Sequence, residues 1–141
     1  MNRLLLLSLA ALLLLSDWAS VGSQPQRAYF HRNESIENDI GYCQALRNGN
    51  TLDISGIAGQ GDMASAVRSA YERLSLTLEA NGLSFADVVK ENVFATDLDP
   101  FIRNKEIRKE FYGQSFPAAT WVQIQRLYLP SFIVEINLTA E

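Results

Sequence analysis

The residues from Met63 to Gly82, MASAVRSAYERLSLTLEANG, place the strongest constraint on how this chain folds. Apolar side chains return there at the spacing of one helical face, and Asn81-Gly82 follows as a left-handed stop. The side chains on that face are Ala66, Val67, Ala70, Leu74 and Leu78. Because a helix with one apolar face must bury it, a second apolar layer has to lie against this segment.

Strand patterns on both sides of the helix identify that second layer as a β-sheet. Asn48-Gly49 is a strong hairpin signal between a segment around Cys43 to Leu46 and the alternating TLDIS that follows. Residues 118–127 and 131–140 predict two further strands near the C-terminus. In residues 85–98, Val89, Val93 and Ala95 alternate with Lys90, Asn92 and Thr96, which predicts a half-buried strand.

A second, shorter helix is predicted between the third strand and the last two strands. Asp99-Pro100 reads as a cap followed by proline at the first helical position, and the helix ends at Gly113. The resulting order is β-β-α-β-α-β-β, an α+β fold with one mixed sheet and both helices on one face. Trp121, with Val122 and Ile124 beside it, gives this strand two partly apolar faces, and oligomerisation would cover the open one.

The N-terminal residues predict an export signal. Leu4 to Leu15 is an unbroken apolar run of twelve residues after a short positive start, too short for a spanning helix of about 20 residues. Cleavage is expected near Ser23, which gives a signal peptide at 1–23, a polar lead-in with room for one edge strand at 24–39, and one domain at 40–141. An uncleaved membrane anchor is the alternative. The mature protein is then periplasmic or extracellular and does not bind the membrane.

Composition excludes several functions. The net charge of −4 offers no basic surface for nucleic acid. His31 is the only histidine and is interpreted as a surface residue, so neither a Ser/His/Asp triad nor a metal centre is expected. Cys43 is the only cysteine, which rules out an intrachain disulfide and slightly favours a periplasm. GIAGQGD, residues 56–62, lacks the spacing of a phosphate loop and predicts a plain loop ending in an Asp62 cap.

Two tripeptides, at Asn33 and Asn137, match the glycosylation sequon and carry little weight because such matches are frequent by chance.

Five motifs occur in an order that resembles the RidA (YjgF-like) family: GYCQA, GNTLDISG, DVVKENVFATDLDPF, EFYGQSFPA and VEI. The resemblance covers about residues 40 to 141. It implies a chorismate-mutase-like fold, a homotrimer, and clefts at the subunit interfaces that bind a small molecule. For the best-known branch it also implies hydrolysis of reactive enamines and imines to 2-oxo acids and ammonia without a cofactor.

The same resemblance assigns the candidate site residues. Glu135 would position the attacking water, and Thr120 matches a small hydroxyl-bearing residue; Tyr42, Ser55, Gly56 and Asn104 match ligand-binding positions. The family's FPAR motif ends in an arginine that binds the substrate carboxylate, and Ala119 stands at that position. Gly41 replaces the proline that usually precedes the tyrosine, and the loop after Ser55-Gly56 is shorter than in the deaminase branch.

Arg126 does not replace the missing arginine on this interpretation. It lies seven residues beyond Ala119 on the same predicted strand, an odd offset that directs it to the opposite face, and it matches a second arginine common in the family. Removing one partner of a buried charge pair costs about 2–5 kcal/mol, or roughly 30-fold to several thousand-fold in affinity or rate.

Two functions remain open. The first is a trimeric binding protein without deaminase activity, which export favours because the cytosolic enzymes that generate such imines lie elsewhere. The second is an imine or enamine hydrolase that acts on a less acidic substrate through Glu135. A third interpretation leaves Glu135 as a structural residue in a vestigial cleft. The nuclease role attached to some family members fits poorly with an acidic, exported chain.

Overall fold

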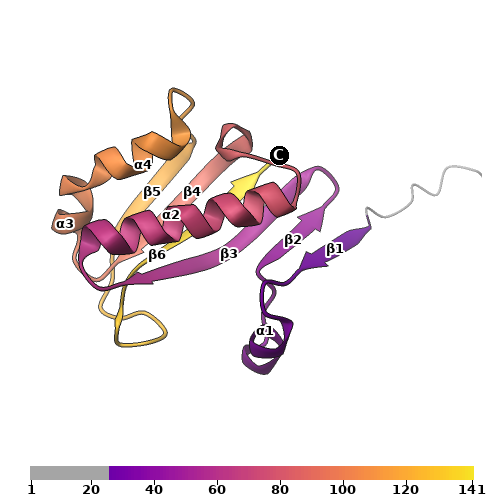
Figure 1. The fold of residues 1–141 in the computed structure, drawn as a ribbon, viewed down its shortest axis with the longest axis horizontal. Helices are drawn as coiled ribbons and strands as arrows, with labels where there is room; N and C mark the ends of the chain where they lie inside the picture. The colour runs from indigo at the N-terminus through magenta and orange to yellow at the C-terminus, as the bar shows by residue number, and fades with distance from the viewer. Residues whose placement is uncertain (1–25) are drawn as a thin grey trace, which may run out of the picture.

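The computed structural model describes residues 26–141, so the predicted signal peptide lies outside the described residues. One sheet of six strands runs in the order β1-β2-β3-β6-β4-β5 (Figure 1). Neighbouring strands are antiparallel except β4 and β5, which are parallel, so the sheet is mixed. The strands are β1 Arg27–Phe30, β2 Ala45–Asn48, β3 Thr51–Gln60, β4 Val88–Ala95, β5 Ala118–Gln123 and β6 Phe132–Ala140.

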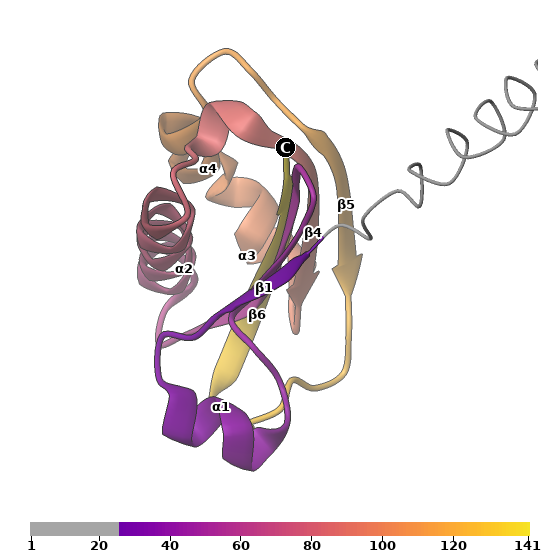
Figure 2. The same ribbon diagram turned by 90° about the vertical axis from the view of Figure 1, so that its right-hand side faces the viewer.

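Three helices cover one face of this sheet, as Figure 2 shows: α2 Met63–Ala80, α3 Leu98–Arg103 and α4 Lys105–Tyr112. A short 3₁₀ turn, η1 Phe85–Asp87, leads into β4. All five residues of the predicted apolar face of α2 have no exposed surface. The Asp62 carboxylate caps this helix by accepting a hydrogen bond from the Ser65 amide. The α+β architecture with helices on one face is therefore confirmed.

The layers approach closely at Gly59. A Cβ at this position would lie 2.9 Å from the Ala66 Cα in α2 and still nearer the Ala66 carbonyl group. The absence of a side chain thus lets β3 and α2 pack directly against each other.

The second predicted helix differs from the prediction at its start and in its continuity. The cap is Asp97, whose side chain accepts from the Asp99 amide, so Pro100 is the third helical residue rather than the first. Proline fits there because its missing N–H would have had no partner in the first turn. Asn104 then ends α3, its amide side chain donating to the Pro100 carbonyl at 2.9 Å, and α4 begins at the next residue.

Three other expectations need correction. Strand β5 ends at Gln123, so Arg126 lies in the following loop and the strand-parity argument does not apply to it. Val89 is 44% exposed instead of buried, because the pairing of β4 with β6 is irregular between Val88 and Lys90, and Val88 is buried in its place. The lead-in contains the expected edge strand, β1, paired with β2, but also an unexpected helix, α1 Glu34–Ile40.

Within residues 26–141, nothing covers the face of the sheet opposite the helices. Five of the six residues of β5 are exposed, and in Figure 2 the helices α2, α3 and α4 all lie on the other side of the sheet. Glu135, Asn137 and Thr139 of β6 point to this open face, since they alternate with the buried Val134, Ile136 and Leu138.

Candidate functional site

Gly56 and Glu135 of the predicted site lie together on the open face. The β3–β6 pairing skips Ser55 and Gly56, resumes at Ile57 opposite Ile136, and places Ala58 opposite Glu135. A Cβ on Gly56 would overlap the Glu135 side chain, with the Glu135 Cγ 2.7 Å away. The glycine therefore makes the space that the carboxylate group occupies. Ser55 precedes it and is fixed by donating its hydroxyl to the Cys43 carbonyl at 2.7 Å.

The Glu135 carboxyl group has no ion-pair partner among residues 26–141. Partial burial raises its pKa above the ordinary value of 4.5. A carboxyl group in this state can exchange a proton closer to neutrality than an exposed glutamate, which is the property required of a residue that activates water.

The charge of Glu135 also acts on Tyr42. It is 39% exposed, and its phenol pKa is raised first by burial and then by the charges of Glu37 and Glu135. The preceding Gly41 adopts a left-handed φ of 91°, which ends α1 and turns the chain toward Tyr42. Glycine here in place of the family's proline is thus explained by the helix that comes before it.

The other predicted site residues lie elsewhere. The Thr120 hydroxyl accepts a hydrogen bond from Lys90 Nζ at 2.8 Å. Glu135 pairs with Phe94 of β4, which pairs with Val122 of β5, so two strand spacings, about 10 Å, separate Glu135 from β5. The Asn104 side chain donates a hydrogen bond to the Pro100 carbonyl at the α3–α4 junction. A single chain therefore does not bring Thr120 or Asn104 to Glu135.

Ala119 is exposed on the edge strand and lies opposite Glu91 of β4. Glu91 is fully buried and accepts hydrogen bonds from Arg108 Nε at 2.7 Å, Trp121 Nε1 at 3.1 Å, and the hydroxyls of Tyr71 and Tyr112 at 2.8 and 2.7 Å. The guanidinium group of Arg108 stacks over Tyr112 with 4.5 Å to the ring centroid. Arg108 is therefore neutralised by Glu91 and held within the core.

Arg126 lies outside the sheet. It is exposed in the β5–β6 loop, where its guanidinium group reaches the Tyr128 carbonyl at 3.4 Å. Lys90 of the neighbouring strand lies opposite Ala118, and the sequence pattern had predicted it only as a polar residue of a half-buried strand. Its position next to Thr120 follows only from the strand register, which sequence alone does not reveal.

His31 was expected to be a surface residue, and the burial of Glu37 was not predicted. The His31 ring is partly buried and its Nδ1 lies 2.7 Å from the Glu37 carboxylate, so it is not a plain surface residue. Glu37 is 2% exposed although it lies in a polar segment. No sequence pattern marks a glutamate whose partners are backbone amides.

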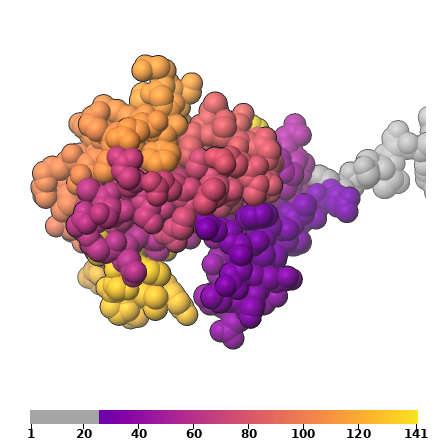
Figure 3. All heavy atoms as spheres, in the orientation of Figure 1, coloured from indigo at the N-terminus to yellow at the C-terminus, as the bar shows by residue number. Residues whose placement is uncertain are grey.

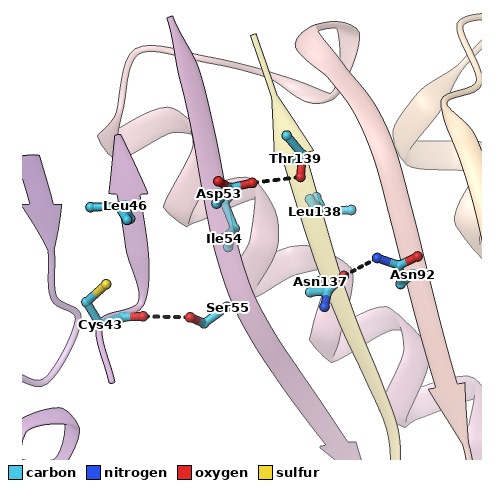
Figure 4. Close-up of a pocket in the computed structure, with 9 residues that line it drawn as sticks. All are labelled: Cys43, Leu46, Asp53, Ile54, Ser55, Asn92, Asn137, Leu138 and Thr139. Atoms are coloured by element: carbon cyan, nitrogen blue, oxygen red, sulfur yellow. Dashed lines mark hydrogen bonds between the residues drawn. The ribbon is translucent and has the colours of Figure 1, made fainter. Parts of the chain in front are cut away.

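A shallow depression of about 340 Å³ also lies on the open face, and Figure 4 shows its lining. Asn92 donates to Asn137 at 2.9 Å and Thr139 to Asp53 at 2.8 Å across its floor. Its lining combines these polar side chains with apolar ones such as Leu46 and Leu138, and it includes Cys43 and Ser55. These paired side chains give the uncovered face a defined hydrogen-bonding pattern.

Within residues 26–141, no group of three or more His, Cys, Asp or Glu side chains is arranged to hold a metal ion. In the same part of the chain, no helix has the length and apolar character needed to cross a bilayer.

Comparison with known proteins gives consistent matches over this domain. A family model described as Endoribonuclease L-PSP matches residues 33–141. A RutC family protein of Pyrococcus horikoshii is 34% identical over 104 residues, covering 67% of this chain and 82% of the relative. A 2-iminobutanoate/2-iminopropanoate deaminase of Dermatophagoides farinae is 30% identical over 95 residues, covering 61% and 74%. The crystal structure of Rv2704 from Mycobacterium tuberculosis, a member of the YjgF/YER057c/UK114 family, matches with a TM-score of 0.75 at 28% identity and covers 82% of this chain and 98% of that one.

Proposed function

Because this chain belongs to the RidA (YjgF-like) family, we propose that it is an exported homotrimer that binds a small molecule between subunits and lacks 2-imino acid deaminase activity. Ala119 is the observation that carries the proposal. The position where the family places its carboxylate-binding arginine holds a methyl group on an exposed strand. Deaminase activity on a 2-imino acid requires that carboxylate to be bound.

The positions of two arginines support the loss of this anchor. Arg108 is committed to the buried Glu91 carboxylate, and Arg126 lies in a loop beyond the strand. Without a guanidinium group at this point, a substrate carboxylate loses about 2–5 kcal/mol of binding free energy. This loss lowers the rate or affinity roughly 30-fold to several thousand-fold.

The trimer is supported by two features of the single chain. The sheet face opposite the helices is open, and the site residues divide between Glu135 on β6 and Thr120 on the edge strand β5. A neighbouring copy that covers this face would supply the second half of each cleft. Export rests on the apolar run from Leu4 to Leu15.

We expect no ribonuclease activity from this chain, although the matching family model is named for an endoribonuclease. The net charge is −4, so the chain has no excess of cations to neutralise a phosphate backbone. We expect no nucleic acid partner and no cofactor.

The deciding experiment compares wild type, Ala119→Arg and Leu76→Arg in the hydrolysis of 2-iminopropanoate and 2-iminobutanoate generated in situ. The proposal expects wild type at background and Ala119→Arg at least 30-fold above it, because the arginine restores the carboxylate anchor. Leu76→Arg, which places the same side chain at a 56% exposed position on α2, is the control and stays at background. Wild-type activity well above background contradicts the proposal.

The alternative function is hydrolysis of an imine that carries no carboxylate. The partly buried Glu135 favours it, because its raised pKa and free carboxylate suit a residue that activates water. Ammonia release from such a neutral imine by wild type, abolished in Glu135→Gln, would support this second function. Equal rates for the two proteins would exclude it.

A further inference from the structure

Glu37 is a buried acid in an exposed part of the chain. Helix α1 projects from one end of the sheet in Figure 2, apart from the layer formed by α2, α3 and α4. Figure 3 shows a hollow between the indigo atoms of this N-terminal segment and the yellow atoms near the C-terminus. Six of the seven residues of α1 are exposed, and only Glu37 is buried. Its burial therefore comes from contacts with its own chain segment.

The Glu37 carboxylate joins the two ends of that segment. One oxygen accepts from the amides of Arg32 and Asn33 at 2.7 and 2.8 Å. The other oxygen accepts from the Gln44 amide at 2.9 Å and contacts His31 Nδ1 at 2.7 Å. Residues 31–33 and residue 44 are thus held by a single side chain.

Tyr42 lies inside the loop closed in this way. The Glu37 carbonyl accepts from the amides of Gly41 and Tyr42 at 2.8 and 3.0 Å, so the same residue fixes the backbone that carries the phenol. Its charge also contributes to the raised pKa of Tyr42.

A continuous set of hydrogen bonds connects Glu37 with the Glu135 site. Gln44, held by Glu37, exchanges two bonds with Ser55: its side chain donates to the Ser55 carbonyl at 3.1 Å, and its own carbonyl accepts from the Ser55 amide at 2.9 Å. Ser55 adjoins Gly56, over which the Glu135 side chain packs.

We propose that Glu37 is a positioning residue that closes the 31–44 segment and holds Tyr42 beside Glu135 in the ligand cleft. Carboxylates that accept several amide hydrogen bonds are strong, directional attachments. The inference rests on the proposed function only in that Tyr42 and Glu135 line the ligand cleft.

The test variant is Glu37→Gln. An amide keeps one acceptor oxygen but turns the other into a donor, so it cannot accept from both ends of the segment at once. Glu34→Gln, an exposed glutamate on the same helix, removes the same charge and is the matched control. If Glu37→Gln does not fold, Glu37→Asp, which keeps the charge but is too short to reach both ends, replaces it in every measurement.

The first readout is the titration of Tyr42, taken as the difference in phenolate absorbance between each protein and its Tyr42→Phe counterpart. We expect a lower Tyr42 pKa in Glu37→Gln, because the phenol loses both burial and a neighbouring negative charge, and no change in Glu34→Gln. A residue that only stabilised the fold would lower the melting temperature and leave this titration in place.

The second readout is amide hydrogen exchange at Gln44 and Asn33 by NMR in the full mature chain. Exchange of at least one of these amides should be at least tenfold faster in Glu37→Gln than in Glu34→Gln. Unchanged exchange together with an unchanged Tyr42 titration would overturn the inference.

The third readout tests function in the Ala119→Arg background with 2-iminopropanoate. Adding Glu37→Gln should lower kcat/KM at least tenfold, and adding Glu34→Gln should leave it unchanged; equal values would contradict a role in the cleft. If Ala119→Arg itself gains no activity, the proposed function fails, and the titration and exchange results still decide the role of Glu37.

Discussion

Three acidic side chains of this chain show how local partners decide what a carboxylate does. Burial alone would raise the pKa of Glu37, but hydrogen bonds from Asn33, Arg32, His31 and Gln44 lower it overall. Glu91 is fully buried and satisfied by four side-chain donors. Glu135 has no ion-pair partner in residues 26–141, and its pKa is raised by burial. Only the last is available to a ligand or to water.

The raised pKa of Glu135 predicts a stability cost that appears as the pH rises. A carboxyl group whose pKa is higher in the folded protein stabilises the fold below its unfolded pKa, and this contribution is lost as the pH rises through the folded pKa. We expect wild type to lose stability relative to Glu135→Gln as the pH rises from 4.5, the ordinary pKa of a glutamate, towards neutrality. Urea unfolding of both proteins across this range measures the difference, and parallel curves would contradict the prediction.

Removing the Glu91 carboxylate, in contrast, is expected to destabilise the fold. Glu91→Ala leaves the Arg108 guanidinium group buried without its counter-charge, with a side chain only 7% exposed, and should cost about 3–5 kcal/mol in the free energy of unfolding. Glu110→Ala removes the exposed Arg68–Glu110 pair and should cost far less, which makes it the control. Equal urea midpoints for the two variants would show that the Glu91 network does not stabilise the core.

At the scale of elements, two glycines of β3 predict different consequences of the same substitution. Gly59→Ala would drive a methyl group into the backbone of α2 at Ala66 and should destabilise by about 1–3 kcal/mol, since a helix backbone cannot give way locally. Gly56→Ala meets the flexible Glu135 side chain instead, which can rotate aside. Thermal unfolding should therefore separate the two variants, with Gly59→Ala the less stable; the reverse order would contradict the close packing of β3 and α2.

The elements divide into those that local sequence determines and those it does not. Helix α2 and the β2–β3 hairpin were predictable because apolar periodicity and the Asn48-Gly49 turn act over short distances. The start of α3 was not, because Asp97 and Asp99 are both plausible caps, and the choice depends on where β4 ends. Helix α1 was missed because its one buried side chain, Glu37, is polar.

The candidate site was predictable only in part. Ser55 and Gly56 lie where the β3–β6 pairing is irregular, and Gly56 lies against the Glu135 side chain; the motifs placed all three residues in the site. Lys90 beside Thr120 depends on the pairing of β4 with β5, which are separated by two helices in the sequence. Such contacts become visible only when the strands are assembled.

For the whole molecule, the decisive asymmetry is that helices cover one side of the sheet and nothing in the described residues covers the other. The open side carries paired polar groups, Asn92 with Asn137 and Thr139 with Asp53, together with exposed apolar residues such as Val122. A surface with both features suits contact with another protein surface better than free exposure to water. In the proposed trimer this face is the shared centre.

That proposal predicts the effect of a single charge on assembly. Val122, 37% exposed on β5, points away from the helices because its neighbour Trp121 packs against Phe101 of α3 with ring centroids 5.1 Å apart. Val122→Lys would bury three like charges near the centre of a trimer, so sedimentation equilibrium should show a lower assembly state than wild type. Leu76→Lys, at a 56% exposed position on α2, places the same charge on the outer surface and should leave the trimer intact. If both variants sediment as wild type does, the open face is not the assembly surface, and a cleft shared between subunits would have to be built from another part of the chain.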